Sequence, residues 1–442
     1  MIAPVRGLVF TYGRPMTGNC PTRMTLLLSM ALACAPVCAQ DPPPTITYTV
    51  NTTADLIDDN TGDTLCHTSA GSCSLRAALM QVNHRSASAL IFISVPAGQY
   101  RLTRLPGAGA DETHGDLDLT VPLSAGQAVY LSGAGATRTI LDADQIDRVL
   151  DIGPERVVDI SGLSLRNGHQ GSGGGIQLVD AALTIRDCVI EANHADNDGG
   201  GVYQLSGSLG MRRCSVRANT SGLDGGGLYL SGDASLRDST VSANTAQEGG
   251  GIMSSQRVVL VNSTISANAA RGDGGGIYNR DTRRLYNVSV IGNDADHDRD
   301  EEGGIGGGVY GRAGRTLALV NSLIVDNTVL DAPFPDDCAG MAAAAGQTAF
   351  TEIGTCEVTG PWFIVAQSDV GPLQDNGGAT PTHALQAQSF VIDATSGSLG
   401  CVDETGALLQ TDQRGFPRVI GARCDIGAFE YGAERVFNSG FE

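Results

Sequence analysis

The chain has 442 residues, of which 41% are hydrophobic and only 5% are aromatic. Its formal net charge is -20, and all 28 basic residues are Arg because the sequence contains no Lys. So acidic a surface repels nucleic acid and anionic lipid headgroups, so we expect no nucleic-acid partner. The composition also predicts a large core of aliphatic side chains rather than aromatic ones.

Residues 1–39 are interpreted as an export signal, with Met24 as an alternative start. Arg23 precedes the apolar run TLLLSMALACAPVCA, which ends in small residues just before Gln40. A basic start, an apolar stretch and a small-residue cleavage site are the three parts of a secretory signal peptide. The run is too short to cross a bilayer and contains Pro36, so we expect no transmembrane segment in the mature chain.

Residues 40–115 are predicted to form an N-terminal cap. Within them, SCSLRAALMQVN at Ser72–Asn83 is expected to form a short amphipathic helix. The helix would cover the open end of the following domain, because an uncovered coil end is an unpaired sheet edge.

Residues 116–330 are predicted to form a repeat domain. Glycine triplets recur at intervals of 26, 26, 24, 25 and 32 residues, each followed by Ile, Val or Leu. Self-similarity at such a period indicates a solenoid. The triplets start at Gly173, Gly199, Gly225, Gly249, Gly274 and Gly306.

The segments between the triplets alternate apolar and polar residues with the period of two that strands require. We therefore predict an all-β fold, a right-handed parallel β-helix with one coil per repeat. The glycines would make tight corners, where only Gly tolerates the backbone conformation. In-phase Asn residues would stack inside the next corner as a ladder of hydrogen bonds. They are Asn193, Asn219, Asn244, Asn268, Asn293 and Asn327.

Residues 331–432 are predicted to form a C-terminal domain that continues and then caps the solenoid, and 433–442 a loose tail. Cleavage after Ala39 would leave eight of the 11 Cys, an even number typical of exported proteins. Cys188 and Cys214 are 26 residues apart and in phase, so we predict a bond between neighbouring coils, the alternative being two thiols packed in the core. The local pairs are predicted to be Cys66–Cys73, Cys338–Cys356 and Cys401–Cys424.

Three segments resemble known families. Val50–Asn83, with CSLRAA at Cys73–Ala78, resembles the N-terminal CSLREA domain of secreted bacterial β-helix proteins, although Ala77 stands where that motif has Glu. The repeats resemble those of polymorphic outer-membrane proteins and of the pectin-lyase-like superfamily. Gly371–Ala394 and Thr411–Tyr431 resemble the choice-of-anchor Q domain. The resemblance implies a secreted or cell-surface bacterial protein and brings no established catalytic residues with it.

An acidic residue precedes four successive triplets: Asp198, Asp224, Glu248 and Asp273. Stacking would place these carboxylates about 5 Å apart, where they repel one another unless a cation bridges them. We expect either a solvated acidic ridge or a Ca²⁺ site, since oxygen ligands suit this hard cation. The sequence requires no other cofactor.

The sequence contains no motif that defines catalytic residues. His169, in Asn167-Gly168-His169-Gln170, is interpreted as an exposed turn residue rather than a catalytic one. Four arginines (Arg186, Arg212, Arg213 and Arg237) could line a strand face near carboxylates such as Asp187 and Asp238, but we interpret them as alternating surface charge on outward strand positions. We predict an adhesin-like or glycan-binding module whose partner is an extracellular polysaccharide or a host or cell-surface component. The alternatives are a polysaccharide lyase or glycoside hydrolase acting on acidic polysaccharide, and a structural filament.

Overall fold

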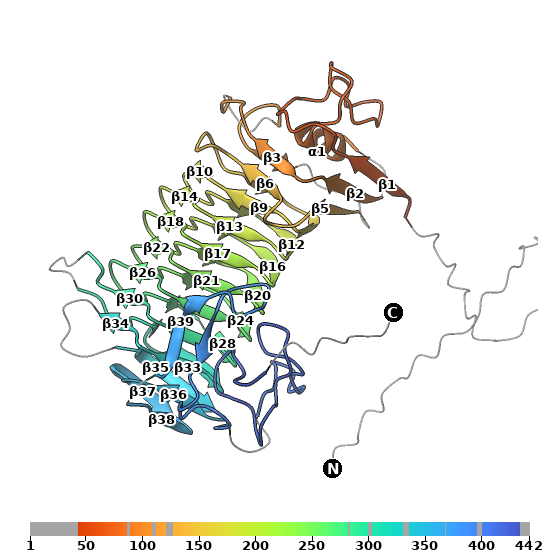
Figure 1. Cartoon of the computed structure of the whole chain (residues 1–442). Coiled ribbons are helices and arrows are strands. Elements are labelled where there is room, and N and C mark those ends of the chain that lie inside the picture. The colour runs from red at the N-terminus through yellow and green to blue at the C-terminus, as the bar shows by residue number, and fades with distance from the viewer. Residues whose placement is uncertain are drawn as a thin grey trace, which may run out of the picture. The chain divides into compact units, whose positions relative to one another are not determined.

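The computed structural model describes residues 43–85, 89–107, 112–120, 127–281, 283–298, 303–329, 336–366, 368–395 and 400–433. The predicted signal peptide and most of the predicted tail lie outside these residues. The described residues belong to one compact unit. Within it the chain winds into a right-handed parallel β-helix, which confirms the predicted fold (Figure 1).

Three long parallel sheets run along the solenoid (Figure 1). Each coil contributes strands to these sheets, and each strand pairs with its counterpart in the next coil. Sheet A has 20 strands: β1 (Thr45–Thr49), β2 (Leu90–Val95), β4 (Leu117–Leu119), β5 (Ala128–Gly133), β7 (Leu150–Ile152), β8 (Val157–Ser161), β11 (Ile176–Leu178), β12 (Ala181–Arg186), β15 (Val202–Gln204), β16 (Gly207–Arg212), β19 (Leu228–Leu230), β20 (Asp233–Arg237), β23 (Ile252–Ser254), β24 (Val258–Val261), β27 (Ile277–Asn279), β28 (Arg283–Tyr286), β31 (Val309–Gly311), β32 (Thr316–Val320), β35 (Cys338–Ala345) and β37 (Thr355–Thr359).

Sheet B has 11 strands: β3 (Gly98–Arg101), β6 (Thr139–Asp142), β9 (Ser164–Arg166), β13 (Val189–Glu191), β17 (Ser215–Arg217), β21 (Thr240–Ser242), β25 (Thr264–Ser266), β29 (Ser289–Ile291), β33 (Leu323–Val325), β36 (Thr348–Phe350) and β38 (Trp362–Ile364). Sheet C has seven short strands: β10 (His169–Gln170), β14 (His194–Ala195), β18 (Thr220–Ser221), β22 (Thr245–Ala246), β26 (Ala269–Ala270), β30 (Asp294–Ala295) and β34 (Thr328–Val329). The sheets thus extend into both segments that flank the predicted repeat domain.

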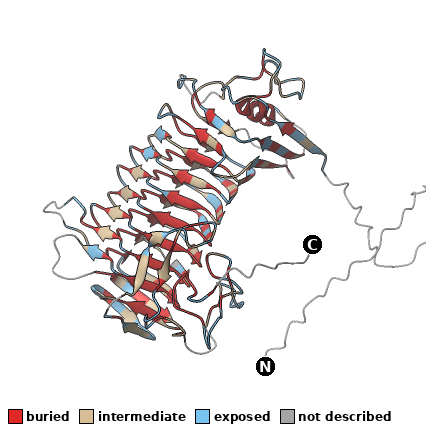
Figure 2. Cartoon of the chain, in the orientation of Figure 1, coloured by how far each residue is buried: buried red, intermediate tan, exposed pale blue. Residues whose placement is uncertain are grey.

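The glycine triplets make the corner that enters sheet A. Gly225 has φ 65°, and a Cβ atom on Gly226 would lie 2.3 Å from the carbonyl oxygen of Thr245 in the next coil. A side chain at either position would therefore strain the backbone or collide with it. The residue after the triplet, such as Leu228, is fully buried. Buried residues recur along the strands of successive coils (Figure 2).

The asparagine ladder is confirmed. Oδ1 of each of the later asparagines accepts hydrogen bonds from both the backbone N–H and the side-chain Nδ2 of the asparagine one coil earlier, at 2.9 to 3.1 Å. The ladder continues one step beyond the predicted set, because Asn327 makes the same two bonds to Asp337. All these side chains are buried, so each bond is protected from water.

The predicted helix forms as α1 (Leu75–Asn83), with Ser74 as its N-cap. All nine of its residues are buried, so its polar face is enclosed as well as its apolar face. Arg76 pairs with Asp55 at 2.7 Å and donates to backbone carbonyls of residues 112–116, while Asn83 accepts a bond from the buried Arg156 at 2.6 Å. These contacts fasten the helix to loops on both sides of it and to the first coils.

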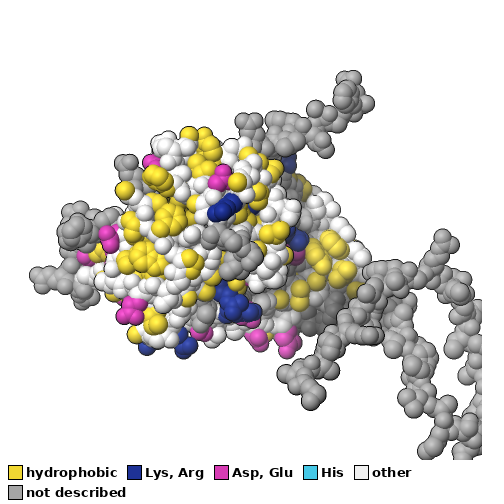
Figure 3. Space-filling model, turned by 90° about the horizontal axis from the view of Figure 1, so that it is seen from below, with side chains coloured by type: hydrophobic (Ala, Val, Ile, Leu, Met, Phe, Trp, Pro, Cys, Tyr) yellow, Lys and Arg dark blue, Asp and Glu magenta, His cyan; other side chains and the backbone are white. Residues whose placement is uncertain are grey.

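The C-terminal segment differs from the expected end cap. Strands β35 to β38 continue sheets A and B, and the chain then folds back and packs along the outer face of sheet B, where β39 (Val370–Gln374) and β40 (Thr382–Leu385) form an antiparallel hairpin (Figure 1). Ile291 and Val325 point outward from sheet B and are buried with Val391 and Phe429 in a second small core. Seen from below Figure 1, hydrophobic side chains form several patches separated by polar surface (Figure 3).

Three disulfides are present: Cys66–Cys73, Cys338–Cys356 and Cys401–Cys424. The predicted fourth is wrong, because Cys188 and Cys214 are free and buried. The predicted register is right, since Val189 pairs with Ser215. Each thiol instead donates to the carbonyl oxygen two residues earlier, at 3.1 and 3.3 Å.

Candidate functional site

Tyrosines form a row along the outside of sheet A. In each coil the second residue after the glycine triplet points outward, between two buried residues, and parallel pairing brings these residues into register. Four of them are half-buried tyrosines that we call the tyrosine row. In coil order the outward positions hold Gln177, Tyr203, Tyr229, Met253, Tyr278 and Tyr310.

The rings of the tyrosine row lie against one another in two pairs. The ring centroids of Tyr203 and Tyr229 are 5.1 Å apart, and those of Tyr278 and Tyr310 are 4.7 Å apart. Stacking of this kind stabilises neighbouring coils. Because the ring faces are turned towards each other, the accessible parts of the row are ring edges and phenol hydroxyls.

Arg280 occupies the gap in the row where one coil carries Met253. Its guanidinium lies 5.3 Å from the ring centre of Tyr278 and pairs with Asp224 at 3.1 Å, two coils earlier. The side chain therefore spans the intervening coil, in which Met253 is fully buried. Arg280 makes the row continuous in polar groups, although one tyrosine is missing.

The predicted acidic residues lie at the corner beside the tyrosine row. Three of them accept the backbone N–H of the next coil: Asp198 from Asp224 at 3.1 Å, Glu248 from Asp273 at 3.0 Å and Asp273 from Ile305 at 3.0 Å. These bonds explain why an acid recurs here, since it satisfies an N–H group that the corner leaves without a strand partner.

Burial raises the pKa of each of these carboxyl groups, and that of Glu248 reaches about 7 because Asp273 adds to the effect. Burial raises the pKa of the neighbouring tyrosines too, and the acids contribute to the shift. The two rows therefore form one electrostatic surface. In the described part of the chain, two clusters each bring three metal-ligating groups within 4.8 Å of one another, and neither contains a residue of the acidic row. Ca²⁺ binding along this row therefore stays a prediction.

An arginine and three acids lie together at the N-terminal end of the same outward row. Asp118 pairs in register with Asp151, which pairs with Gln177. Asp116, Asp118 and Asp151 offer ligand atoms within 4.8 Å of one another, and Arg148 bridges Asp116 at 2.8 Å and Asp151 at 3.4 Å. Burial raises the pKa of Asp116 to about 7 and of Asp118 to about 8.

Arg148 in this cluster is an unsuitable base for proton abstraction. Arg148 is largely buried and also donates to the carbonyl oxygens of Gly173 and Ser172 and to Gln177. A guanidinium held by so many acceptors cannot lose a proton readily.

A shallow groove of about 420 Å³ lies on another part of sheet A. Its floor contains Thr184, Gly210 and Ser235, which are in register on three successive coils. Arg257 and Glu404 line it too, the latter from the C-terminal segment. Small polar side chains at this position leave space for a chain-like ligand.

The four surface arginines each pair with an acid, three of them with an acid of a neighbouring coil. Arg186 contacts Asp159, Arg212 contacts Asp238, Arg213 contacts Asp187, and Arg237 contacts Glu404, at 2.6 to 3.3 Å. The last pair joins the solenoid to the C-terminal segment. These residues are thus charge pairs on the surface and make no cleft of their own.

Comparison with known proteins supports the fold class. A family model described as a right handed beta helix region matches residues 152–295. No curated protein matches the chain. A solved structure titled "Crystal structure of pectate lyase Pel9A" is similar at 15% sequence identity and a TM-score of 0.49, over 88% of this chain and 96% of that one. The family match agrees with the right-handed β-helix of the structure, and so distant a structural likeness says nothing of the activity of this chain.

The structure reveals two features that sequence reasoning missed. The tyrosine row was visible as Tyr directly after the Gly-Gly-Gly-Val/Leu/Ile unit at four of the six triplets. His169 and His194 are 25 residues apart, and each follows the in-phase ladder position.

In the described residues, no helix is long and apolar enough to cross a membrane.

Proposed function

We propose that this protein is an extracellular carbohydrate-binding module that holds a polysaccharide along the tyrosine row. The observation that carries the proposal is the in-register row of four phenols, interrupted once at Met253, beside carboxylates on four successive coils. A polymer of sugar hydroxyls needs repeated donors and acceptors at a regular spacing. Phenols, carboxylates and a guanidinium offer both kinds of group, repeated at the coil spacing of about 4.8 Å.

Secretion is part of the proposal. The predicted signal peptide supports it, and so do three disulfides, which are rare in reducing compartments. The resemblance to CSLREA and choice-of-anchor Q domains agrees with a cell-surface location. We infer a bacterial cell surface or its surroundings, including the outer membrane, as the place where the polymer is met.

The second candidate is a lyase or hydrolase acting on acidic polysaccharide. It rests on Arg148 and the three acids, which lie on the same outward row and which a bound polymer would reach. The engaged guanidinium and the buried carboxylates favour binding over turnover.

The test is affinity electrophoresis and calorimetry with neutral and uronate polysaccharides. Tyr203→Phe, Tyr229→Phe, Tyr278→Phe and Tyr310→Phe together keep the stacking and remove the hydroxyls. If each hydroxyl makes one hydrogen bond of about 1 kcal/mol, the combined variant should bind at least about 100-fold more weakly. Tyr130→Phe is the matched control, because Tyr130 stacks on Phe92 elsewhere on sheet A.

Unchanged affinity in the combined variant would refute the tyrosine row as the binding surface. The same polymers are to be assayed for unsaturated products and for reducing ends. Turnover that Arg148→Gln abolishes would establish the second candidate instead.

A further inference from the structure

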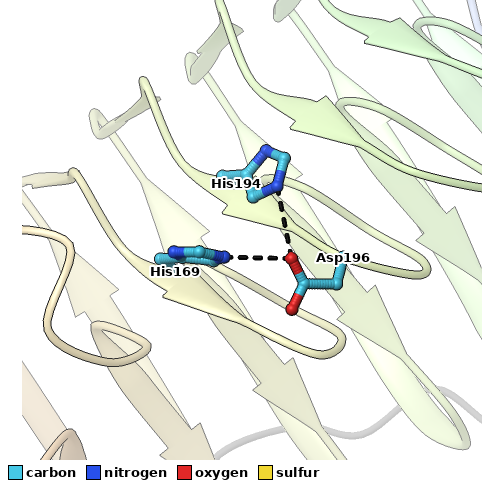
Figure 4. Close-up of side chains that lie close together, drawn as sticks. All are labelled: His169, His194 and Asp196. Carbon is cyan, nitrogen blue, oxygen red and sulfur yellow. Dashed lines mark hydrogen bonds and ion pairs between the residues drawn. The ribbon is translucent and has the colours of Figure 1, made fainter.

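Two histidines and one aspartate converge at the corner formed by sheet C. Nε2 of His169 lies 3.0 Å from Oδ1 of Asp196, and Nε2 of His194 lies 3.4 Å from the same atom. Figure 4 shows both rings turned towards this carboxylate from neighbouring coils. The rings meet edge to face, with centroids 4.7 Å apart.

The fold imposes this arrangement. His169 and His194 pair in register on β10 and β14, and Asp196 follows His194 by two residues, which brings it to the same side of the chain. Backbone bonds hold the corner: His194 donates to Gly168 at 2.8 Å, and Asp196 donates to Gln170 at 3.0 Å. The three side chains are therefore held on backbone that the solenoid makes rigid.

The distances suit a small tetrahedral ion. Ligand atoms about 2.0 to 2.2 Å from zinc stand roughly 3.3 to 3.5 Å apart in a tetrahedron. The two separations from Asp196 Oδ1, 3.0 and 3.4 Å, lie near that value, and all three ligand atoms lie within 4.8 Å of one another. Small side-chain rotations would admit the ion between them.

We propose that His169, His194 and Asp196 form a binding site for a divalent transition-metal ion, Zn²⁺ in the first place. Two imidazoles and one carboxylate are a ligand set for Zn²⁺ and its neighbours in the first transition row, whereas Ca²⁺ requires more oxygen ligands. Each imidazole loses its Nε2 proton or changes tautomer when the ion binds. The ion links two coils, and its fourth position faces solvent because all three side chains are about half exposed.

The site is independent of the proposed function, since it lies on sheet C and the tyrosine row lies on sheet A. Other histidines in the described residues provide a contrast. His84 pairs with Glu112, and His297 pairs with Asp294. Neither histidine belongs to a cluster of three metal-ligating groups. His297 therefore supplies a matched control: an exposed histidine that contacts a single acid.

The experiment is calorimetric titration of the chelator-treated, full-length protein with ZnCl₂. We expect one ion per chain at this site, with affinity lowered at least about tenfold in His169→Ala and in His194→Ala. His297→Ala should bind like the unmodified protein, as should the combined tyrosine variant. Electron paramagnetic resonance of the Cu²⁺-loaded protein should report two nitrogen ligands, and one in either single variant.

Circular dichroism of each variant checks that the coils remain folded, which is expected for exposed side chains. Absence of zinc heat in the unmodified protein would overturn the proposal. Equal zinc affinity in the double variant His169→Ala/His194→Ala would overturn it too, because the ion would then be bound elsewhere.

Discussion

Asn327 donates both its backbone N–H and its side-chain Nδ2 to Oδ1 of Asp337, at 3.1 and 2.8 Å. Each earlier rung is an asparagine. Its side-chain oxygen accepts hydrogen bonds from the asparagine of the coil before it, and its NH₂ group donates to a backbone carbonyl oxygen of that same coil, as Asn244 does to Val216. Asp337 can accept but has no amide to donate. A carboxylate therefore ends the ladder, and its second oxygen accepts three bonds from Thr351 and Glu352.

Replacing this last rung should destabilise the protein. In Asp337→Asn the new NH₂ group would face the donors of Thr351 and Glu352 or of Asn327. Leaving buried donors without acceptors costs about 1 to 3 kcal/mol each. We therefore expect the free energy of unfolding, measured with urea, to fall by about 2 to 4 kcal/mol. Asp326→Asn, on an exposed neighbouring residue, should change it by less than about 0.5 kcal/mol. Equal stability of the two variants would contradict the account of the ladder's end.

The two free cysteines should behave as buried thiols. Burial raises the pKa of Cys188 to about 12 and that of Cys214 further. A thiol reagent should therefore modify neither residue in the native protein and both after unfolding. Serine occupies the same position in three later coils and makes the same bond, as Ser239 does to the carbonyl oxygen of Arg237 at 2.8 Å. Cys188→Ser/Cys214→Ser should thus alter the free energy of unfolding by no more than about 1 kcal/mol. A peptide that links the two cysteines in non-reducing mapping would contradict the assignment of both as free thiols.

Stability should fall as the pH rises from 4 towards 8, as far as the buried carboxyls are concerned. Burial raises the pKa of Asp118 from 3.8 to about 8 and that of Glu430 from 4.5 to about 7. The folded state then holds protons that the unfolded state has released, so ionisation favours unfolding. Asp118 Oδ2 is also buried without a hydrogen-bond partner in the described residues.

The pH prediction is tested by urea unfolding of the unmodified protein and of Asp118→Asn at several pH values. The variant should gain stability relative to the unmodified protein as the pH rises through about 4 to 8. A constant difference between them across this range would show that Asp118 ionises normally.

Removing the C-terminal segment should expose a hydrophobic strip of sheet B. Ile291 and Val325 are buried by that segment, and each contributes about 1.5 to 3 kcal/mol through burial. A chain ending at residue 366 should therefore self-associate in analytical ultracentrifugation. The same truncation carrying Ile291→Ser and Val325→Ser should remain monomeric, because Ser242 and Ser266 occupy the equivalent positions in earlier coils. A monomeric truncated chain without these substitutions would argue against the strip.

Ca²⁺ binding along the acidic row is a further prediction. One oxygen of Asp198, Glu248 and Asp273 accepts a backbone N–H, which leaves the other oxygen to meet a cation. Thermal melts with Ca²⁺ should exceed those with a chelator by several degrees, and Asp198→Asn/Asp273→Asn should remove the difference. Coinciding melts for the unmodified protein would leave the row as a set of caps for backbone N–H groups.

The solenoid and its ladder could be predicted from the sequence because they are local and periodic. Each coil repeats the same instructions: a glycine triplet for the corner, alternating apolar residues for the strands and an asparagine for the ladder. A coil whose sequence departs from the pattern can still be aligned, because the neighbouring coils fix the spacing of the repeat. The same phase placed Cys188 beside Cys214 and the acids at one corner, so the register was available without a structure.

What the sequence alone left open depends on side-chain direction and on contacts between distant segments. Phase could not show that two thiols point to backbone carbonyls instead of to each other, because that depends on side-chain rotation. Nor could it show that the C-terminal segment returns along sheet B, although the outward positions change from Arg217 through Ser266 to Ile291 and Val325. The sequence by itself determined the repeating coil, whose bonds join equivalent residues of neighbouring repeats. Only the tertiary structure decided which outward rows are covered, because those contacts join the coils to a segment outside the repeats, and which side chains converge, because that depends on how each side chain is rotated.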